Sequence, residues 1–576
     1  MRRLFLAAAL LLACRASAQS PSEQLKKFFA GAFEEQLRDQ PELATNVGRH
    51  EYDDRWSDWS KAGRELRRSH LQQRLKALDA IPLDGASEED RLSARLFRYD
   101  TQQQLDAYEL QTLLLPVTQL YGLHNSIYNV VDRMPARTAH DYQNLLARLR
   151  AVPAYVEQNI GRLDEAIARG LTQPKSVVDN VLAQLDAQLA QDSSNTPLLL
   201  AFRKFPSSIP AADQEKLREE AVANYDKQFL PAWHKLRDYL GGTYAQHERS
   251  GTGLGTLPGG KEQYAILIRR YTTTNLTSEE IHGIGERELA RIEAEMLSLA
   301  RQTGFSGTLK EFEDKLAADP AQHFRSKDEM LVFCRNAAKI IEPNLPTLFK
   351  HIPVLLYGVR AIPADREAAT ASNAQAASPD GSSPGWFNLN TYEPEKQARS
   401  NKEALVLHEA VPGHVFQGAV ARAAQGVPEF RRFYGNSAYG EGWALYAESL
   451  GQELGLYKDP LSRFGQLSSE RFRAVRLIVD TGMHAQGWTR EQAVQFFQLH
   501  APDQSVAEID RYISWPGQCL SYKIGQLKIR ELRTEAEQKL GARFDIRDFH
   551  DVVLRDGTLP LDLLQEQVEH YIAATH

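Results

Sequence analysis

The sequence predicts a mainly α-helical protein, a large two-lobed helical body around a groove with a small β element. Apolar residues recur at three- and four-residue spacings through most of the 576 residues, which is typical of amphipathic helices. Several of these segments open with a capping signal, for example Thr277 to Glu280. One short stretch, Gly385 to Asn390, alternates polar and apolar residues in the manner of a strand.

A Gly-rich turn at residues 251–260 divides the helices into an N-terminal helical lobe, residues 19–256, and a C-terminal helical lobe, residues 257–576. Every motif with chemical character lies in the C-terminal lobe. Helices are expected over these segments: Ser22–Arg38, Trp59–Leu78, Glu88–Leu110, Ala139–Arg169, Pro174–Ala190, Ala211–Leu240, Ser278–Gln302, Ser326–Leu348, Lys402–Ala424, Gly440–Leu454, Ser462–Gln486, Arg490–His500, Val506–Leu540 and Asp545–Leu554.

The first 18 residues, MRRLFLAAALLLACRASA, predict a secretory signal peptide. Two arginines precede an apolar run that is too short to span a bilayer, and an A-x-A cleavage site ends at Ala18. We therefore expect an exported protein, periplasmic or secreted, with no integral membrane segment after cleavage. Lipid attachment at Cys14 is the second choice, because Leu12 is bulky for that processing site.

Charge and cysteine content narrow the function classes. Removal of residues 1–18 takes away three arginines and no acid, so the formal charge changes from −7 to −10. An acidic chain without basic clusters argues against nucleic-acid binding. After signal cleavage only Cys334 and Cys519 could form a disulfide, and the sequence does not decide whether they do.

The chemically most informative segment is HEAVPGH, residues 408–414. Two imidazoles, a carboxylate beside the first, and a downstream carboxylate are the groups that a catalytic zinc centre requires. Three protein ligands hold such an ion, a water takes the fourth position, and a further Glu accepts the proton of that water. We expect His408 and His414 to be metal ligands and Glu409 to be the general base.

The two histidines are six residues apart, whereas the usual HExxH signature has them four apart on one helix face. On an ideal helix, six residues correspond to about 120° of rotation, so a straight helix cannot present both to one ion. Pro412 interrupts the helix, and Gly413 tolerates the positive φ that a local bulge demands. We expect a two-residue bulge that returns His414 to the face of His408 and Glu409.

A second segment, GEGWALYAE at residues 440–448, has the apolar spacing of a helix. Glu441 stands at its start and is expected to be the third zinc ligand. Glu448 lies seven residues further on, almost in line with Glu441. It is expected to hold a ligand imidazole from behind, although it could itself be the third ligand or part of a solvated face.

Three further blocks accompany these motifs: PGWFNLN at 384–390, RLIVDTGMHAQGW at 476–488 and RYISWPGQCLSYKIG at 511–525. Together with LHEAVPGHVFQ and YGEGWALYAESL they resemble a large bacterial family catalogued as a domain of unknown function. That family is similar in its motif to the gluzincin zinc peptidases. The resemblance covers most of the chain and implies a mostly helical, zinc-peptidase-like fold. Cys519 stands where a small residue such as Ala is expected.

These blocks carry the remaining candidate site residues. Peptide hydrolysis builds negative charge on the carbonyl oxygen, and His484 and Tyr522 are the candidate donors to it. Asp480 lies one helical turn before His484 and could fix its tautomer or raise its pKa, or the two could form a purely structural pair. Arg511 and Lys523 could bind a carboxylate of the substrate, which would favour cleavage at C-termini.

The alternating stretch at residues 385–390 is the β element expected beside the zinc helix. Trp386, Asn388 and Asn390 share one face and are expected to contact the substrate, and the free edge of the strand could pair with an extended peptide. The preceding segment, residues 363–384, is rich in Ala and Ser and is expected to be a mobile loop. It could be a lid over the cleft or an indifferent surface excursion.

Together these residues predict a zinc-dependent metallopeptidase, a hydrolase that binds one Zn²⁺ per chain and cleaves peptide bonds with a metal-activated water and Glu409. Two alternatives remain open. One is a zinc amidase acting on a non-peptide substrate, and the other is a non-catalytic peptide-binding protein with a degenerate metal site. Imidazole and carboxylate ligands also accept manganese or cobalt, so zinc is a preference.

Overall fold

The structure is a computed structural model that describes residues 19–110, 112–364, 367, 370–377, 384–424 and 426–575. The expected signal peptide, including Cys14, lies outside the described residues. The chain is mainly helical, as predicted, and carries one small sheet. No helix in the described part of the chain has both the length and the apolar character needed to cross a membrane.

The helices are α2 (Pro21–Asp39), α3 (Pro41–Asn46), α4 (Lys61–Asp79), α5 (Glu88–Glu109), α6 (Leu123–Arg133), α7 (Ala139–Ala168), α8 (Lys175–Leu189), α9 (Ala211–Asn224), α10 (Leu230–Gly241), α11 (Gly260–Thr272), α12 (Ser278–Gln302), α13 (Leu309–Ala318), α14 (Lys327–Ile341), α15 (Lys402–Glu409), α16 (His414–Ala423), α17 (Glu429–Phe433), α18 (Ser437–Glu448), α19 (Pro460–His484), α20 (Arg490–His500), α21 (Ala507–Ser514), α22 (Leu520–Leu540), α23 (Ile546–Leu554) and α24 (Leu561–Thr575). The strands are β1 (Tyr357–Ala361), β2 (Asn373–Gln375) and β3 (Gly385–Leu389).

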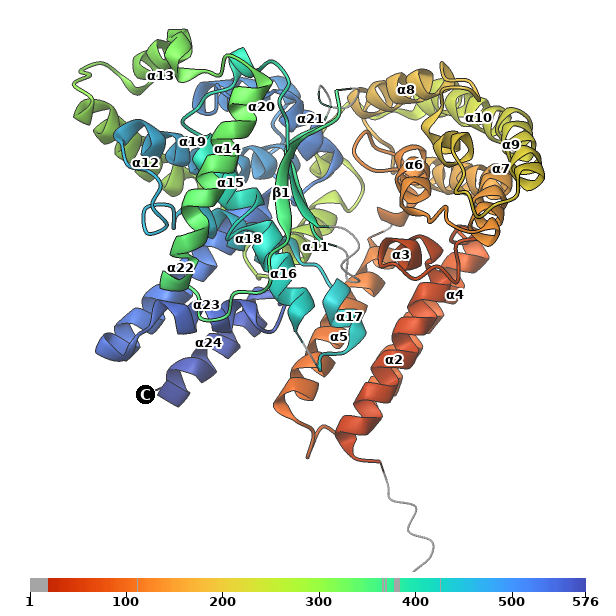
Figure 1. Cartoon of the computed structure of the whole chain (residues 1–576), viewed down its shortest axis with the longest axis horizontal. Coiled ribbons are helices and arrows are strands. Elements are labelled where there is room, and N and C mark those ends of the chain that lie inside the picture. The colour runs from red at the N-terminus through yellow and green to blue at the C-terminus, as the bar shows by residue number, and fades with distance from the viewer. Residues whose placement is uncertain are drawn as a thin grey trace, which may run out of the picture.

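Two large apolar cores organise these helices. Figure 1 shows α6 to α10 on one side of the molecule and the helices from α12 onward on the other. The core of α6 to α10 draws its buried residues from positions 56–244, whereas the core around the C-terminal helices also includes α2 and α5. Phe29 of α2 and Phe97 of α5 both contact Phe430 of α17, with ring centroids 5.2 and 5.3 Å apart. The lobe boundary at residue 256 stays a prediction, and the first helices pack against elements from beyond it.

The predicted helix boundaries agree best with the structure where the sequence contains a capping signal, and they fail at glycines. The predicted segment Ser278–Gln302 is α12, whose first turn is closed by a capping box between Thr277 and Glu280. The segment Val506–Leu540 was expected to be one helix, but it breaks into α21 and α22 at Gly517, which has a φ of +79°. Helix α11 was not expected, because the Gly-rich sequence at its start is typical of a loop.

The sheet has the strand order β1-β3-β2. Strand β3 pairs parallel with β1, where Phe387 lies opposite Val359, and antiparallel with β2, where Phe387 lies opposite Ala374. The expectation that β3 pairs with a peptide through a free edge is therefore wrong, since both edges are occupied. Strand β2 belongs to the segment expected to be a mobile loop, so that prediction fails for residues 373–375; residues 365, 366, 368, 369 and 378–383 of the segment lie outside the described residues.

The two cysteines that could have formed a disulfide remain free. Cys334 in α14 and Cys519 at the start of α22 are both buried thiols. Burial raises the pKa of the Cys334 thiol to about 12, so it behaves as a small apolar side chain.

Candidate metal centre

The interruption predicted between the two motif histidines is present. Helix α15 ends at Glu409, residues 410–413 form a turn, and α16 begins at His414. The imidazole rings of His408 and His414 are 4.9 Å apart between centroids and nearly perpendicular, with an interplanar angle of 88°. The broken helix thus presents both imidazoles to one point, which an unbroken helix with this spacing cannot do.

The expected reason for Gly413 is wrong. Its φ is −72°, so the turn does not require a left-handed residue. A Cβ atom at this position would instead lie 1.9 Å from the carbonyl oxygen of His408. The turn is further fixed by Trp443 of α18, whose indole N–H donates a 2.8 Å hydrogen bond to the carbonyl of Pro412. Gly413 is therefore needed because the backbone folds back closely on the end of α15.

Helix α18 supplies the third potential ligand. Its first turn is capped by the side chain of Asn436, and Glu441 follows one turn later. One Glu441 carboxylate oxygen lies 3.3 Å from Nε2 of His414 and 3.6 Å from Nε2 of His408. One ligand atom from each of these three residues lies within 4.8 Å of the others, which is close enough to hold one metal ion.

A close helix crossing brings α22 to the same place. A Cβ atom at Gly442 of α18 would lie 2.5 Å from the Cα of Gly525, and a Cβ atom at Gly525 would lie 1.9 Å from the carbonyl oxygen of Ala438. Glycine is required on both sides because the two backbones touch. Tyr522, one turn before Gly525, consequently stacks beside His408, with ring centroids 6.4 Å apart and an interplanar angle of 11°.

The electrostatics of the three-residue cluster favour a cation. His408 donates from Nδ1 to Oε1 of the fully buried Glu448 at 2.8 Å, which fixes its ring and leaves Nε2 directed at Glu441. Burial opposes a charge on His408, but Glu441 and Glu448 outweigh it and raise the pKa of His408 to about 9. Two imidazoles and one carboxylate, with a carboxylate behind the first imidazole, are the donor set of a catalytic zinc site, so these residues fit a zinc ion.

Glu409 is placed to exchange a proton beside this cluster. Its side chain is buried, and no residue in the described part of the chain donates a hydrogen bond to its carboxylate. Burial raises the pKa of Glu409, while His408 and His414 act in the opposite direction. A buried carboxylate that is free of protein donors can accept a proton from a neighbouring water.

Arginines surround Tyr522, and sequence reasoning gave no role to two of them. The guanidinium of Arg476 lies 4.5 Å from the centre of the Tyr522 ring, and Arg511 approaches the Tyr522 hydroxyl at 3.4 Å. Arg473 lies 3.7 Å from Glu448. Burial, with the neighbouring Glu441, raises the pKa of Tyr522, so its hydroxyl stays protonated and can donate. The available signal was the three arginines, Arg473 and Arg476 among them, in the short α19 segment RFRAVR, whose other residues are apolar.

His484, expected to be a candidate donor to the substrate, is a structural residue. It is fully buried, its Nδ1 accepts a hydrogen bond from the backbone N–H of Leu254 at 3.0 Å, and its Nε2 donates to the carbonyl of Tyr512 at 3.1 Å. Burial lowers its pKa to about 3, so the ring is neutral. Both nitrogens are bonded to backbone groups, so neither is available to a substrate.

Asp480 does not hold His484 in the expected way. Its carboxylate accepts from the hydroxyl of Tyr264 at 2.5 Å and from the N–H of Gly517 at 3.0 Å, whereas the nearest His484 nitrogen is 3.8 Å away. Burial raises the pKa of Asp480 to about 7. The residue ties α19 to the turn before α22, which is a structural role.

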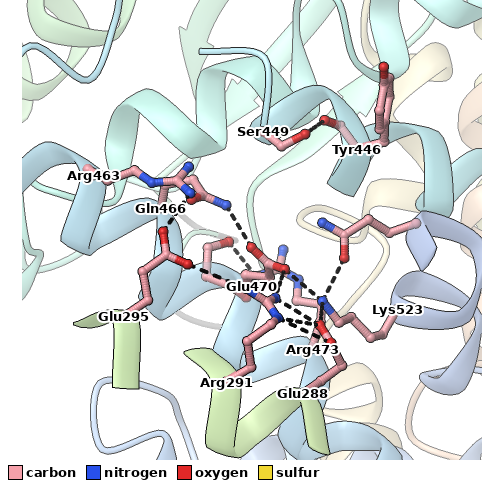
Figure 2. A network of polar contacts seen from close by, with 12 residues as sticks. Glu288, Arg291, Glu295, Tyr446, Ser449, Arg463, Gln466, Glu470, Arg473 and Lys523 are labelled. Atoms are coloured by element: carbon pink, nitrogen blue, oxygen red, sulfur yellow. Dashed lines mark hydrogen bonds and ion pairs between the residues drawn. The ribbon is translucent and has the colours of Figure 1, made fainter. Parts of the chain in front are cut away.

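Lys523 is likewise unavailable to a substrate. Figure 2 shows it inside a network of charged side chains, where its Nζ lies 2.7 Å from Glu470 and 2.7 Å from Glu288. Arg291 contacts the same two carboxylates at 2.7 and 2.8 Å, and the Lys523 side chain is fully buried. The expected carboxylate-binding role is therefore wrong for Lys523, because its charge is already neutralised where α12, α19 and α22 meet.

The polar residues of β3, and Asn390 directly after it, are bonded within the protein. The Asn388 amide accepts from Arg360 at 2.7 Å and donates to Asn373 at 3.0 Å. The Asn390 amide donates to the carbonyls of residues 367 and 370. The ring of Trp386 lies under the guanidinium of Arg360, 4.4 Å from its centre. These side chains therefore hold β1, β2 and the segment before β3 together. The amides of Asn388 and Asn390 are already bonded within the protein, so the structure does not support their expected contacts with the substrate.

Comparisons with known proteins agree with this fold. A crystal structure from Colwellia psychrerythraea is 26% identical, with a TM-score of 0.91 over 97% of this chain and 100% of that one. A structure from Shewanella oneidensis, 18% identical, has a TM-score of 0.75 over 95% of this chain and 99% of that one, and shares the fold. They are described as a "putative lipoprotein" and a "putative lipoprotein of unknown function". No protein of curated function matches the chain. The family model for bacterial proteins of unknown function, DUF885, matches residues 41–568, and the chain therefore belongs to the DUF885 family.

Proposed function

We propose that this DUF885 protein is an exported zinc-dependent peptidase. The proposal depends on one observation: ligand atoms of His408, His414 and Glu441 lie within 4.8 Å of one another. Two imidazoles and a carboxylate leave a fourth position open for a reacting molecule, which distinguishes catalytic zinc sites from closed structural ones. The resemblance of the motif to gluzincins supports the same reading.

The residues around the centre suit hydrolysis of an amide bond. His408, His414 and Glu441 would hold the ion, and bound zinc lowers the pKa of water and polarises a carbonyl. Glu409 takes a proton from the attacking water and passes it to the leaving amine nitrogen. Tyr522 stays protonated, and its hydroxyl donates to the oxygen that becomes negative during attack.

Replacement of Glu409 tests the proposal directly. Glu409→Gln keeps the size of the side chain but cannot accept the proton, so zinc content should stay near one equivalent while cleavage falls on the order of 10³-fold. The assay is mass-spectrometric digestion of a mixed peptide library. Glu403→Gln is the matched control, since Glu403 lies on the same helix and its carboxylate accepts from the N–H of Tyr457. Full activity of Glu409→Gln would contradict the assignment.

The library also separates the alternatives. If the protein binds zinc but cleaves no peptide, the zinc amidase that acts on a non-peptide substrate is favoured. Absence of both zinc and cleavage would favour a binding protein with a degenerate metal site.

Export is proposed from the first 18 residues and from the lipoprotein descriptions of the two similar structures. Signal cleavage after Ala18 would give a chain that begins at Gln19, whereas lipid attachment would leave Cys14 as the first residue. The intact mass of protein recovered from the envelope of the producing cells distinguishes the two forms.

A further inference from the structure

We infer that the substrate carries a carboxylate one residue beyond the cleaved bond, and that Arg511 binds it. The inference rests on the proposed peptidase function and adds its substrate class. The carboxylate belongs either to the C-terminal residue of the peptide or to an acidic side chain at the same position. Aromatic side chains beside Arg511 point to an apolar or aromatic last residue, and hence to the C-terminal carboxylate.

The side chain of Tyr522 lies between Arg511 and His408 of the metal cluster. Arg511 extends from α21, donates to Gln518 at 2.6 Å, and reaches the hydroxyl of Tyr522 at 3.4 Å. Tyr522 in turn stacks on His408. One extended residue spans about 3.5 Å, so a peptide whose scissile carbonyl oxygen lies at Tyr522 can bring the carboxylate of the next residue to Arg511. The side chain of Arg511 is 18% exposed, so a ligand can approach it.

The charge around Arg511 is incompletely balanced. The same Glu508 oxygen accepts from Arg511 at 3.2 Å and from Arg476 at 2.9 Å, so one carboxylate serves two guanidiniums. Asp480 uses its oxygens on other donors. Arg476 is 4% exposed, and its Nη1 has no hydrogen-bond partner among the described residues. An excess of buried positive charge is costly in a protein interior and is relieved when a ligand brings an anion. Lys523 offers no such excess, because two carboxylates already surround it.

Aromatic rings line the same region. Trp515 lies 5.9 Å from the Arg511 guanidinium, donates to the hydroxyl of Tyr271 at 2.6 Å, and contacts Tyr121 with ring centroids 5.7 Å apart. Tyr121 is 43% exposed, so part of its ring is accessible to a ligand. Its hydroxyl donates to the carbonyl of Ser514 at 2.9 Å, so the segment before α6 contacts the end of α21. Such rings favour an apolar or aromatic side chain.

The test compares three blocked dipeptides: acyl-Ala-Phe with a free carboxylate, its C-terminal amide, and the amide of acyl-Ala-Glu. Release of the last residue gives kcat/KM for wild type, Arg511→Met and Arg511→Lys. Arg490→Met is the matched control. Arg490 of α20 also carries a guanidinium, which is bonded at 2.7 and 2.9 Å to Asp510, the neighbour of Arg511 in α21. Binding of the same peptides to zinc-loaded Glu409→Gln, measured by calorimetry, gives Kd without turnover.

The free acid should be cleaved and bound on the order of 100-fold better than its amide by the wild-type site. Arg511→Met should bring that ratio close to one, Arg511→Lys should keep part of it, and Arg490→Met should keep all of it. If the Glu amide instead shows the preference, the carboxylate is that of a side chain.

The outcomes separate the two proposals. Equal cleavage of all three peptides would overturn the inference and leave the peptidase standing. Cleavage of none, with the free acid still bound far more tightly than the amide, would remove the peptidase and keep the carboxylate site. Equal binding without cleavage would remove both.

Discussion

Loss of the carboxylate behind His408 should weaken zinc binding more than any other single change outside the three ligands. Glu448 is fully buried, receives the Nδ1 proton of His408 at 2.8 Å, and lies 3.7 Å from Arg473. Glu448→Gln keeps an acceptor for that proton and removes the negative charge. Glu448→Ala removes both and leaves a buried N–H without a partner.

The contacts of His408 set the direction of the effect. Glu441 and Glu448 raise the pKa of His408 against the opposing effect of burial, so both carboxylates favour positive charge at this imidazole. Loss of the carboxylate partner of a ligand imidazole typically costs about 10- to 100-fold in metal affinity, and Glu448→Gln, which keeps the hydrogen-bond acceptor, should cost roughly tenfold. An unpaired buried N–H adds about 1 kcal/mol or more, so the Ala variant should lose up to about 100-fold.

Competition with a chromogenic zinc chelator at neutral pH measures these affinities. Glu453→Gln is the control, because Glu453 is exposed in the turn after α18 and its charge is screened by water. The order of affinity should be wild type and Glu453→Gln, then Glu448→Gln, then Glu448→Ala. Wild-type affinity in Glu448→Ala would refute the reasoning.

Three further predictions concern the scaffold of the site. Trp443→Phe removes the 2.8 Å hydrogen bond to the carbonyl of Pro412. It should lower the free energy of unfolding by about 1 kcal/mol in urea titrations and weaken zinc binding. Unchanged zinc affinity would mean that this bond does not hold the turn. Gly525→Ala places a Cβ 1.9 Å from the carbonyl of Ala438 and should destabilise the protein by more than about 3 kcal/mol in the same titrations, so near-wild-type stability would contradict the close crossing. Burial lowers the pKa of His550 to about 3, so between pH 6.5 and 3 the unfolded chain binds the extra proton and stability falls as the pH falls. His550→Gln should shrink the difference in unfolding free energy between pH 6.5 and 4.5 by about 2 kcal/mol, and an unchanged difference would show that this ring does not titrate on unfolding.

The ligand cluster could be predicted because its information is local. Two histidines on either side of a helix-breaking dipeptide, and a Glu at the start of the next apolar helix, are patterns within short segments. The helix that carries Glu448 also puts it seven residues from Glu441, and that spacing follows from helix geometry alone.

The roles of His484 and Lys523 could not be predicted, because they depend on partners distant in the chain. His484 is bonded to the backbone of Leu254, 230 positions earlier. Lys523 is neutralised by Glu288 of α12 and by Glu470 of α19. The sequence motif shows that these residues are polar, but it does not show whether the polar group faces a substrate or another helix.

Strand β3 shows the same limit for the fold. Its alternation predicted a strand, but its place at the centre of the sheet depends on β2, a three-residue element inside a sequence rich in Ala and Ser. Such composition is typical of loops, and only the pairing with β3 makes residues 373–375 extended.

The glycine-to-glycine contact between α18 and α22 bears on how the centre is loaded with metal. Because the two helix backbones touch at Gly442 and Gly525, α18 with Glu441 cannot move against α22 with Tyr522 without a steric clash. The metal-binding site is therefore preorganised, and little of the binding free energy is spent on ordering the chain. Stripping the metal with a chelator should therefore leave a folded apoprotein that regains its ion on simple mixing, in contrast to small zinc domains that unfold when they are emptied.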